Sequence, residues 1–321
     1  MSEQKLIAVV GATGAQGGGL VRAILEDPAR TFAVRALTRN PDSSGAKALA
    51  AAGAEVVAAD LDDEASVRAA FEGAYGAYVV TNYWAATEDA TRTRAEMELA
   101  QAENAARAAA AAGVEHVIWS TLEDTRPFFG DRDDVPSLDD GRYKVPHFDA
   151  KGEADALFTK YGVPTTFLRT TFYFDAFING MGPTRDADGK LTISMPMADK
   201  PLSGIASDDI GRTALAIFKQ GTAYIGITVS IAGDHLTGHE YAAALTEALG
   251  EEVAYQPLTW DQYQALPFPM ATEFSNMFQF YAEDHERFTG DRNLDKVRAL
   301  NPDLLSFADW LTKHKGAIPT K

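Results

Sequence analysis

The sequence Gly11-Ala12-Thr13-Gly14-Ala15-Gln16-Gly17-Gly18 lies between an apolar run at 6–10 and a helical pattern at 16–26. Its G-x-x-G-x-x-G spacing is one residue longer than the common dinucleotide-binding fingerprint. Glycines let the backbone turn tightly and approach a pyrophosphate, and the following helix presents N–H groups and a positive dipole end to the phosphates. A loop of this kind between a strand and a helix predicts a dinucleotide-binding βαβ unit; a purely structural turn is the alternative.

The rest of the first half continues this alternation of strands and helices. Apolar runs predict strands at 6–10, 32–37, 55–59, 77–81, 114–120 and 164–169, and helical patterns lie between them, the longest over 88–112. Strands that alternate with helices form a parallel sheet covered on both faces. The predicted fold class is therefore α/β, a Rossmann-type doubly wound parallel sheet.

Beyond residue 170 the pattern loosens. Strands are predicted at 191–195 and 224–231, and helices at 209–219, 240–249 and 273–283. We therefore expect a dinucleotide-binding domain over 1–170 and a smaller mixed α/β domain over 171–321. The second domain would hold a substrate or a protein partner, with some of its chain crossing back to the Rossmann core.

Residues 122–146 interrupt the alternation and are rich in Asp, Pro and Gly. A polar connection of this length is uncommon inside a compact domain and is usually a lid or a disordered segment. We assign it to the first domain, together with a helix that begins at residue 147.

The composition limits the partners of the chain. Its 29 basic and 46 acidic residues give a formal net charge of −17, which disfavours direct nucleic-acid binding. Cysteine is absent, which excludes thiol catalysis and disulfides. The sequence shows no apolar run of about 18 residues and no signal peptide at its beginning, so we expect a cytoplasmic protein without a membrane partner.

The end of the second predicted strand indicates which nucleotide binds. NAD-specific folds place a carboxylate there to accept from the ribose 2′-OH. This chain has Leu37-Thr38-Arg39-Asn40 instead, and Arg39 can pair with a 2′-phosphate. NADP(H) is therefore the expected cofactor, unless Arg39 is a solvated surface residue. Asp60, after the third strand, is expected to accept from the adenine amino group, to cap the next helix, or to do both.

Several stretches of the chain resemble one known family. GATGAQGG at 11–18, TRNP at 38–41, GAEVVAADLDD at 53–63, GAYVVTNYW at 76–84 and HFDAKGEAD at 147–155 are similar to the NmrA-like family of atypical short-chain dehydrogenases, with its NADPH-sensing HSCARG-type branch closest. The resemblance extends through 275–288 and covers nearly the whole chain.

The resemblance also implies a set of residues in contact with NADP(H). They are Gly11, Thr13, Gly14, Ala15, Gln16, Gly17, Arg39, Asp60, Leu61, Thr81, Asn82, Tyr83, Lys151, Tyr173 and Phe174. The chain departs from the family in two places. Some members carry a lysine on the long helix, whereas the corresponding stretch here is Glu98-Leu99-Ala100-Gln101. The turn at 173–176 ends in alanine where the family often has asparagine.

The catalytic pair of short-chain dehydrogenases is altered in this chain. Active members use Tyr-x-x-x-Lys on one helix face, where the lysine holds the nicotinamide ribose and lowers the tyrosine pKa. Here the segment runs from His147 to Lys151. One interpretation is a non-catalytic NADP(H) sensor that regulates a protein partner. The other is an NADPH-dependent reductase of a small carbonyl or activated alkene, with His147 as proton donor, or else a nearby tyrosine, Tyr143, Tyr83 or Tyr173.

Two further groups of polar residues have alternative roles. Ser120, at the end of the fifth strand, is expected either to orient a substrate or to cap a helix or turn. His235 and His239 have a spacing seen in metal sites, but Thr237 and Glu240 form the capping pattern T-x-x-E. The capping pattern places His235 outside the helix, so no metal site is predicted.

Overall fold

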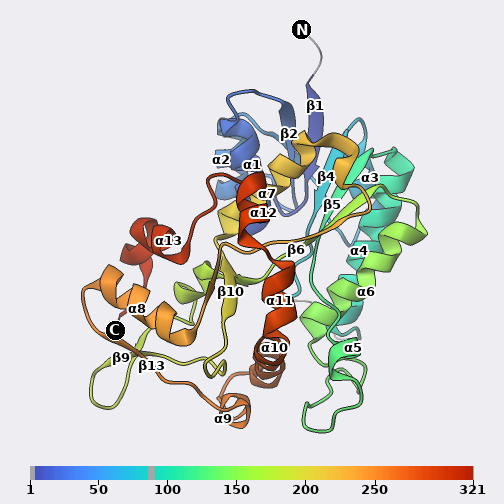
Figure 1. The fold of residues 1–321 in the computed structure, drawn as a ribbon. Helices are drawn as coiled ribbons and strands as arrows, with labels where there is room; N and C mark the ends of the chain where they lie inside the picture. The colour runs from blue at the N-terminus through green and yellow to red at the C-terminus, as the bar shows by residue number, and fades with distance from the viewer. Residues whose placement is uncertain (1–3, 86–90, 321) are drawn as a thin grey trace. The chain divides into compact units, whose positions relative to one another are not determined.

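The computed structural model describes residues 4–85 and 91–320. The chain divides into two compact units (Figure 1). The first unit comprises residues 1–124, 147–169 and 210–229, and the second comprises 125–146, 170–209 and 230–321. Each unit is described by itself.

The first unit is built on a seven-stranded sheet with the order β3–β2–β1–β4–β5–β6–β11. The strand pairs from β3 to β6 are all parallel. The order 3-2-1-4-5-6 is that of a doubly wound dinucleotide-binding sheet, in which ligands bind where the strand order reverses, here between β1 and β4. The predicted Rossmann-type fold is confirmed. The strands are β1 (Lys5–Val9), β2 (Phe32–Thr38), β3 (Glu55–Ala58), β4 (Gly76–Val79), β5 (His116–Thr121), β6 (Thr165–Arg169) and β11 (Thr228–Ser230).

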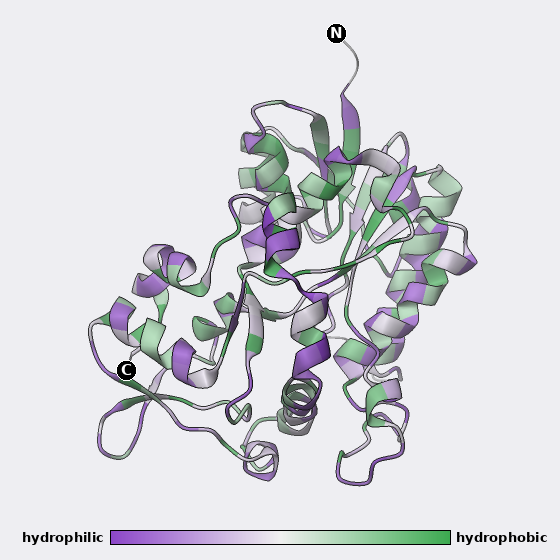
Figure 2. Ribbon diagram, in the orientation of Figure 1, coloured by the Kyte–Doolittle hydropathy of each residue, from purple (hydrophilic) through white to green (hydrophobic). Residues whose placement is uncertain are grey.

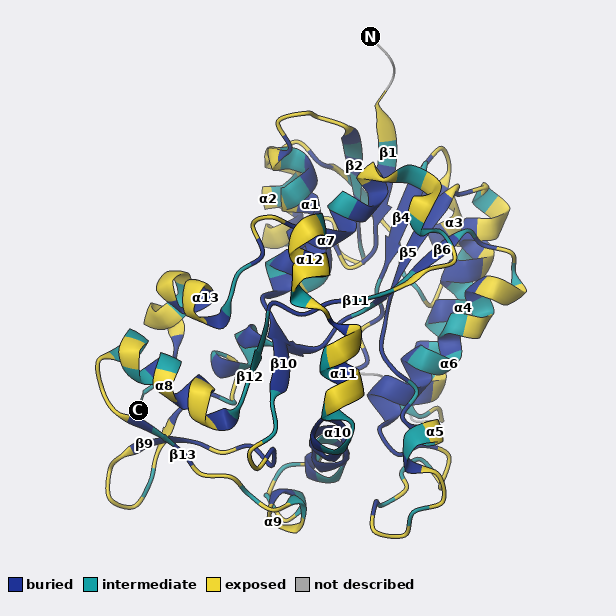
Figure 3. Ribbon diagram, viewed as in Figure 1, coloured by how far each residue is buried: buried dark blue, intermediate teal, exposed yellow. Residues whose placement is uncertain are grey.

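Helices pack on this sheet through apolar faces. They are α1 (Ala15–Glu26), α2 (Ser44–Ala51), α3 (Glu64–Phe71), α4 (Arg94–Ala112), α6 (Pro146–Lys160) and α7 (Ser207–Lys219), of which α6 and α7 have their first residues in the second unit. Figure 2 shows hydrophilic and hydrophobic residues distributed around α4 and α6. Strands β4 and β5 are buried along their whole length (Figure 3). The unit therefore has the fully buried parallel strands that helices on both faces require.

Local sequence signals set the ends of the long helix α4. Thr93 and Glu96 form a capping box at its beginning, and Gly113 ends it in the left-handed conformation, with φ of 67°. The predicted start near residue 88 lies outside the described residues, and the helix begins at Arg94. The predicted strand over 224–231 was wrong in its first half. Residues Gly221–Tyr224 form a 3-10 turn, η2, and Gly226 has φ of +78°, which interrupts an extended strand.

The second unit contains two three-stranded sheets, β12–β10–β7 and β13–β9–β8, with mixed strand directions. Rings of Phe174, Phe177, Tyr241, Phe307 and Trp310 pack together in its core. Its elements are α5 (Arg126–Phe129), β7 (Phe172–Tyr173), η1 (Phe174–Phe177), β8 (Thr184–Arg185), β9 (Leu191–Ile193), β10 (Leu202–Ile205), β12 (Asp234–Leu236), α8 (Gly238–Leu249), β13 (Val253–Tyr255), α9 (Trp260–Gln264), α10 (Ala271–Glu283), α11 (His285–Asp291), α12 (Leu294–Leu300), α13 (Phe307–His314) and η3 (Lys315–Ala317).

The polar segment after β5 belongs to the second unit, so its assignment to the first domain was wrong for residues 125–146. The Asn276 side chain, on α10, donates to the backbone oxygens of Pro136 and Lys144 at 2.8 and 2.7 Å. Arg132 pairs with Glu283, also on α10, at 2.5 Å. Buried Phe129, Val135, Tyr143 and Val145 add apolar anchors that the polar composition of the segment concealed.

No described helix combines the length and the apolar character needed to cross a membrane.

Candidate functional site

The glycine loop joins β1 to α1 with the geometry that a phosphate site needs. Gly11 adopts a φ of +65°, which favours glycine. A Cβ on Gly17 would lie 2.4 Å from the Gly11 carbonyl oxygen, so only glycine lets the helix approach the loop this closely. Gly14 begins α1 without a side-chain cap, and the first turn carries no acidic residue. The helix therefore presents an N-terminus suited to an anion, with Gly11, Thr13, Gly14 and Ala15 exposed beside it.

Gln16 is held by two hydroxyl groups from neighbouring strands. Its Oε1 accepts from the Tyr78 hydroxyl at 2.5 Å and from Ser120 Oγ at 2.7 Å. Ser120 is only 1% exposed, and its hydroxyl helps to fix the Gln16 side chain at the start of α1. The contact between Ser120 and a substrate stays a prediction.

The residues expected around the adenosine lie at the ends of β2 and β3. Arg39 directly follows β2 and is exposed. Asp60 accepts from the Asp62 backbone at 3.1 Å, whereas the residue that caps α3 is Asp63. The expectation that Asp60 caps the helix was therefore wrong, and Asp60 instead holds the turn before it. The Leu61 carbonyl accepts from Asn104 of α4 at 2.8 Å.

Lys151 lies in a buried cluster that joins α6 to α4 and to the end of β4. Its Nζ donates to Thr81 Oγ1 and to Glu98 Oε1, both at 2.7 Å. The Thr81 hydroxyl in turn donates to the same Glu98 oxygen. Glu98 is 2% exposed and Lys151 is 8% exposed. The structure thus brings the predicted Thr81 and Lys151 together and adds Glu98, which the sequence analysis did not select.

His147 packs one turn before Lys151 among aromatic rings. Its ring centre lies 4.9 Å from those of Trp84 and Phe148, and 5.8 Å from that of Tyr83. The imidazole is 6% exposed and Tyr83 is 7% exposed, whereas Trp84 is 40% exposed. Asn82 Oδ1 accepts from the Trp84 backbone at 3.2 Å and so holds the turn that carries both rings.

Three predicted residues belong to the second unit. Tyr173 is half-buried, and Phe174 is fully buried against Phe307 and Trp310. Tyr143 is 1% exposed, and the guanidinium groups of Arg126 and Arg142 lie over its ring. Their predicted contacts with cofactor or substrate stay predictions.

The capping box predicted around Thr237 is confirmed at the start of α8. His235 lies before that helix, and its ring contacts Ser203 Oγ at 2.8 Å and the Arg292 carbonyl at 3.0 Å. Hydrogen bonds within the second unit therefore account for this histidine.

Asp155 is a second acidic residue that the sequence analysis did not select. It lies one turn after Lys151 on α6, where it accepts from Thr121 Oγ1 at 2.6 Å and from Trp119 Nε1 at 2.9 Å. Burial raises the pKa of its carboxyl from the ordinary 3.8 to about 6, against the opposing effects of Thr121, Arg169 and Trp119.

This shift predicts how stability depends on pH. The folded state keeps the Asp155 proton to a higher pH than the unfolded chain, so the free energy of unfolding falls as the pH rises from about 4 to about 6. At about 1.36 kcal/mol per pKa unit, the cost at neutral pH reaches about 3 kcal/mol. Asp155→Asn removes this dependence. The free energy of unfolding of the variant should therefore increase relative to that of the wild type as the pH rises from about 4 to about 6.

Denaturant unfolding at about pH 4 and pH 7 measures this difference. Burial also lowers the pKa of His116 to about 4, which destabilises the fold as the pH falls from about 6.5 toward 4. His116 is present in both proteins, so its contribution cancels in the comparison. A stability difference that is equal at the two pH values would contradict the assignment to Asp155.

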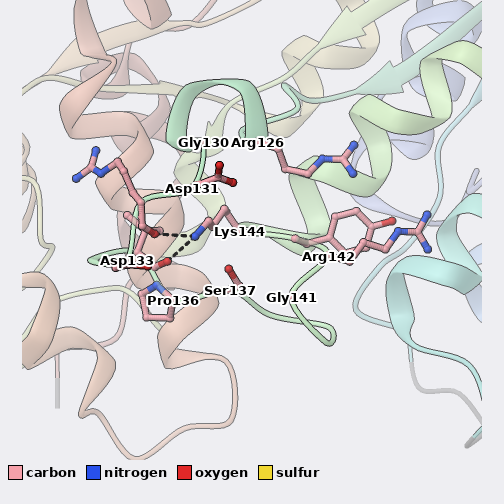
Figure 4. A pocket seen from close by; sticks show the side chains of 12 residues that line it. Arg126, Gly130, Asp131, Asp133, Pro136, Ser137, Gly141, Arg142 and Lys144 are labelled. Atoms are coloured by element: carbon pink, nitrogen blue, oxygen red, sulfur yellow. Dashed lines mark hydrogen bonds between the residues drawn. The ribbon is translucent and has the colours of Figure 1, made fainter.

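A polar cavity of about 540 Å³ lies within the segment 126–144 of the second unit (Figure 4). The Lys144 ammonium donates to the backbone oxygens of Arg132 and Val135 at 2.9 and 2.8 Å, which fixes one wall. Its lining includes neither the glycine loop nor Lys151. This cavity is thus separate from the residue set that the sequence predicted for the cofactor.

The profile of the NmrA-like family matches residues 3–311 of the chain. The chain belongs to the NmrA-like family. A relative from Cladobotryum sp, described as the NmrA-like family domain-containing oxidoreductase FrzB, is 30% identical over 297 residues, covering 86% of this chain and 83% of FrzB. The resemblance found in the sequence is confirmed at the level of the family.

Solved structures share the fold of this NmrA-like protein. NmrA, described as a negative transcriptional regulator and crystallised with NADP and with NAD, aligns with a TM-score of 0.76 and 23% identity over 97% of this chain and 95% of NmrA. The triphenylmethane reductase of Citrobacter sp., complexed with NADP(H), aligns with a TM-score of 0.72 and 20% identity, covering 96% of this chain and 99% of the reductase.

Proposed function

We propose that this NmrA-like protein binds NADP(H) in its first unit and acts as a redox sensor that regulates a protein partner. The observation that carries the proposal is the combination of a complete phosphate loop with an altered catalytic pair. Gly11, Gly14 and Gly17 keep the geometry of the loop, whereas the catalytic tyrosine position holds His147, packed among rings at 6% exposure. A dinucleotide therefore has a site, but the usual exposed phenol beside the nicotinamide is missing.

The residues of the first unit fit such a cofactor. The uncapped start of α1 suits the pyrophosphate, because the positive end of the helix faces it. Exposed Arg39 would bind the 2′-phosphate, and Lys151 would donate to the nicotinamide ribose. When bound, the cofactor supplies hydride chemistry, and the protein residues position it. NmrA, a negative transcriptional regulator of the same fold that was crystallised with NADP and with NAD, supports this proposal.

The choice between the two nucleotides tests the proposal. Arg39 should make a charge-assisted contact that NADH cannot receive, so NADPH should bind more tightly than NADH. Arg39→Ala should remove most of that preference, about 1.5–3 kcal/mol. Fluorescence titration of the wild type and the variant with both nucleotides measures it. Equal affinities in the wild type would refute the role of Arg39, and no binding of either nucleotide would refute the proposed function.

The second candidate function is an NADPH-dependent reductase of a small carbonyl or activated alkene. Relatives described as oxidoreductases favour it, as does the position of His147, one helical turn before Lys151 and beside Tyr83. An imidazole is a common proton donor in enzyme sites. Consumption of NADPH with a panel of aldehydes, quinones and enones distinguishes the reductase from the sensor.

A further inference from the structure

A buried carboxylate of the first unit, that of Glu98, neutralises Lys151. The Glu98 side chain has no exposed surface, and its Oε1 lies 2.7 Å from the ammonium. Its other oxygen, Oε2, is buried and has no hydrogen-bond partner within the described part of the chain. A buried carboxylate with an unsatisfied oxygen is costly, and Lys151 supplies the opposite charge that offsets this cost, beside the hydrogen bond from Thr81.

The position of Glu98 in α4 makes the pairing specific. Ala95, Ala102, Ala105 and Ala109 are all buried on the same helix, and Glu98 continues their spacing of three or four residues. The buried stripe of α4 therefore carries one charged residue, Glu98. Glu98 contacts Lys151, the residue of α6 that the family resemblance places at the cofactor.

We propose that Glu98 sets the selectivity of the site between the oxidised and the reduced cofactor. This inference rests on the proposed function, in which Lys151 lies at the nicotinamide end of bound NADP(H). The nicotinamide ring of NADP⁺ carries a positive charge, and that of NADPH carries none. A lysine alone would repel the oxidised ring, and the Glu98 carboxylate cancels that repulsion. Glu98 is thus a positioning residue that acts through the charge of Lys151.

Three variants change the net charge of the pair in steps. Glu98→Gln keeps the size and an acceptor oxygen but leaves the pair positive, and Lys151→Gln leaves it negative. The double variant is neutral, like the wild type. The ratio of the dissociation constant of NADP⁺ to that of NADPH should rise about tenfold in Glu98→Gln and fall about tenfold in Lys151→Gln, which is the scale for charges several ångströms apart in a partly buried site. The double variant should return close to the wild-type ratio.

A second ion pair between the same two helices supplies the control. Glu103 of α4 pairs with Lys160 of α6 at 3.0 Å, but their side chains are 37% and 58% exposed. Glu103→Gln should leave the ratio unchanged, because water screens that charge. Titrations followed by nucleotide fluorescence and by calorimetry give both constants, and circular dichroism verifies folding.

The outcomes separate this inference from the proposed function. Loss of affinity for both redox forms by the same factor in the single variants, with an unchanged ratio, would overturn the electrostatic role of Glu98. Unchanged affinities in both single variants would show that Lys151 does not lie at the nicotinamide end. A wild type that binds neither form would overturn the proposed function itself. Either single variant suffices if the other fails to fold, because they shift the ratio in opposite directions.

Discussion

Gly14→Val should remove NADPH binding while the protein remains folded. Gly14 has φ of −90° and ψ of −178°, an extended conformation that a β-branched residue adopts without strain. A Cβ there would lie 3.2 Å from the Gly11 carbonyl oxygen, a contact that a small shift relieves. The branched side chain would then occupy the space in front of the first turn of α1. Loss of two charge-assisted phosphate contacts costs about 3–6 kcal/mol, or about 10²–10⁴-fold in affinity.

Gly17→Ala is the matched control for this prediction. Its Cβ would lie 2.4 Å from the Gly11 oxygen and 2.8 Å from the Val10 oxygen, and both atoms belong to the backbone. This smaller substitution should therefore destabilise the fold, whereas Gly14→Val should not. NADPH titration together with thermal unfolding of both variants measures the contrast. Undiminished NADPH affinity in a folded Gly14→Val protein would mean that this loop is not the phosphate site.

His147→Phe should reduce any reductase turnover by about 10²–10⁴, the usual contribution of a positioned proton donor. Phenylalanine keeps a ring of similar size among Trp84, Phe148 and Tyr83 but has no proton to donate. NADPH affinity should change little, because the glycine loop and Lys151 carry that binding. Steady-state rates of NADPH consumption, measured beside a direct titration of NADPH, separate the two effects.

His147→Tyr is the companion variant, because it restores the Tyr-x-x-x-Lys pair. We expect it to create or raise reductase activity if a substrate reaches that position. Full turnover in His147→Phe would exclude His147 as the donor and direct attention to Tyr83, Tyr143 or Tyr173. A wild type that binds NADPH tightly yet turns over no substrate in a broad panel would support the sensor.

Site residues can be predicted from sequence where the signal lies between neighbours in the chain. Glycine spacing, helix caps and the alternation of strands with helices act between neighbours in the chain, so the sequence predicted the phosphate loop, the capping box at Thr237 and the class of sheet. The sequence around Glu98 shows one signal, a charged residue at a position that continues the spacing of the alanines of α4. The neighbouring residues do not indicate which lysine Glu98 pairs with.

The polar segment after β5 shows what composition does not reveal. Its composition indicated a lid or a disordered segment, and the structure adds that Arg132 pairs with Glu283 and that Asn276 of α10 donates to its backbone. These anchors lie more than a hundred residues away in the chain, so no local pattern distinguishes an anchored polar segment from a mobile one.

The sequence by itself determined the Rossmann-type architecture. It also predicted the position of the phosphate loop and, through the family resemblance, that His147 stands where active members have the catalytic tyrosine, since each depends on residue types at short and fixed spacings. Only the tertiary structure decided that Gln16 is held by Tyr78 and Ser120, that Asp155 is buried against Thr121, and that Lys151 is neutralised by Glu98. The two partners of that ion pair are 53 residues apart, and packing of α4 beside α6 brings them together. Such contacts depend on which helix faces pack together. A charge has a strong electrostatic effect on its neighbours only where that packing excludes water.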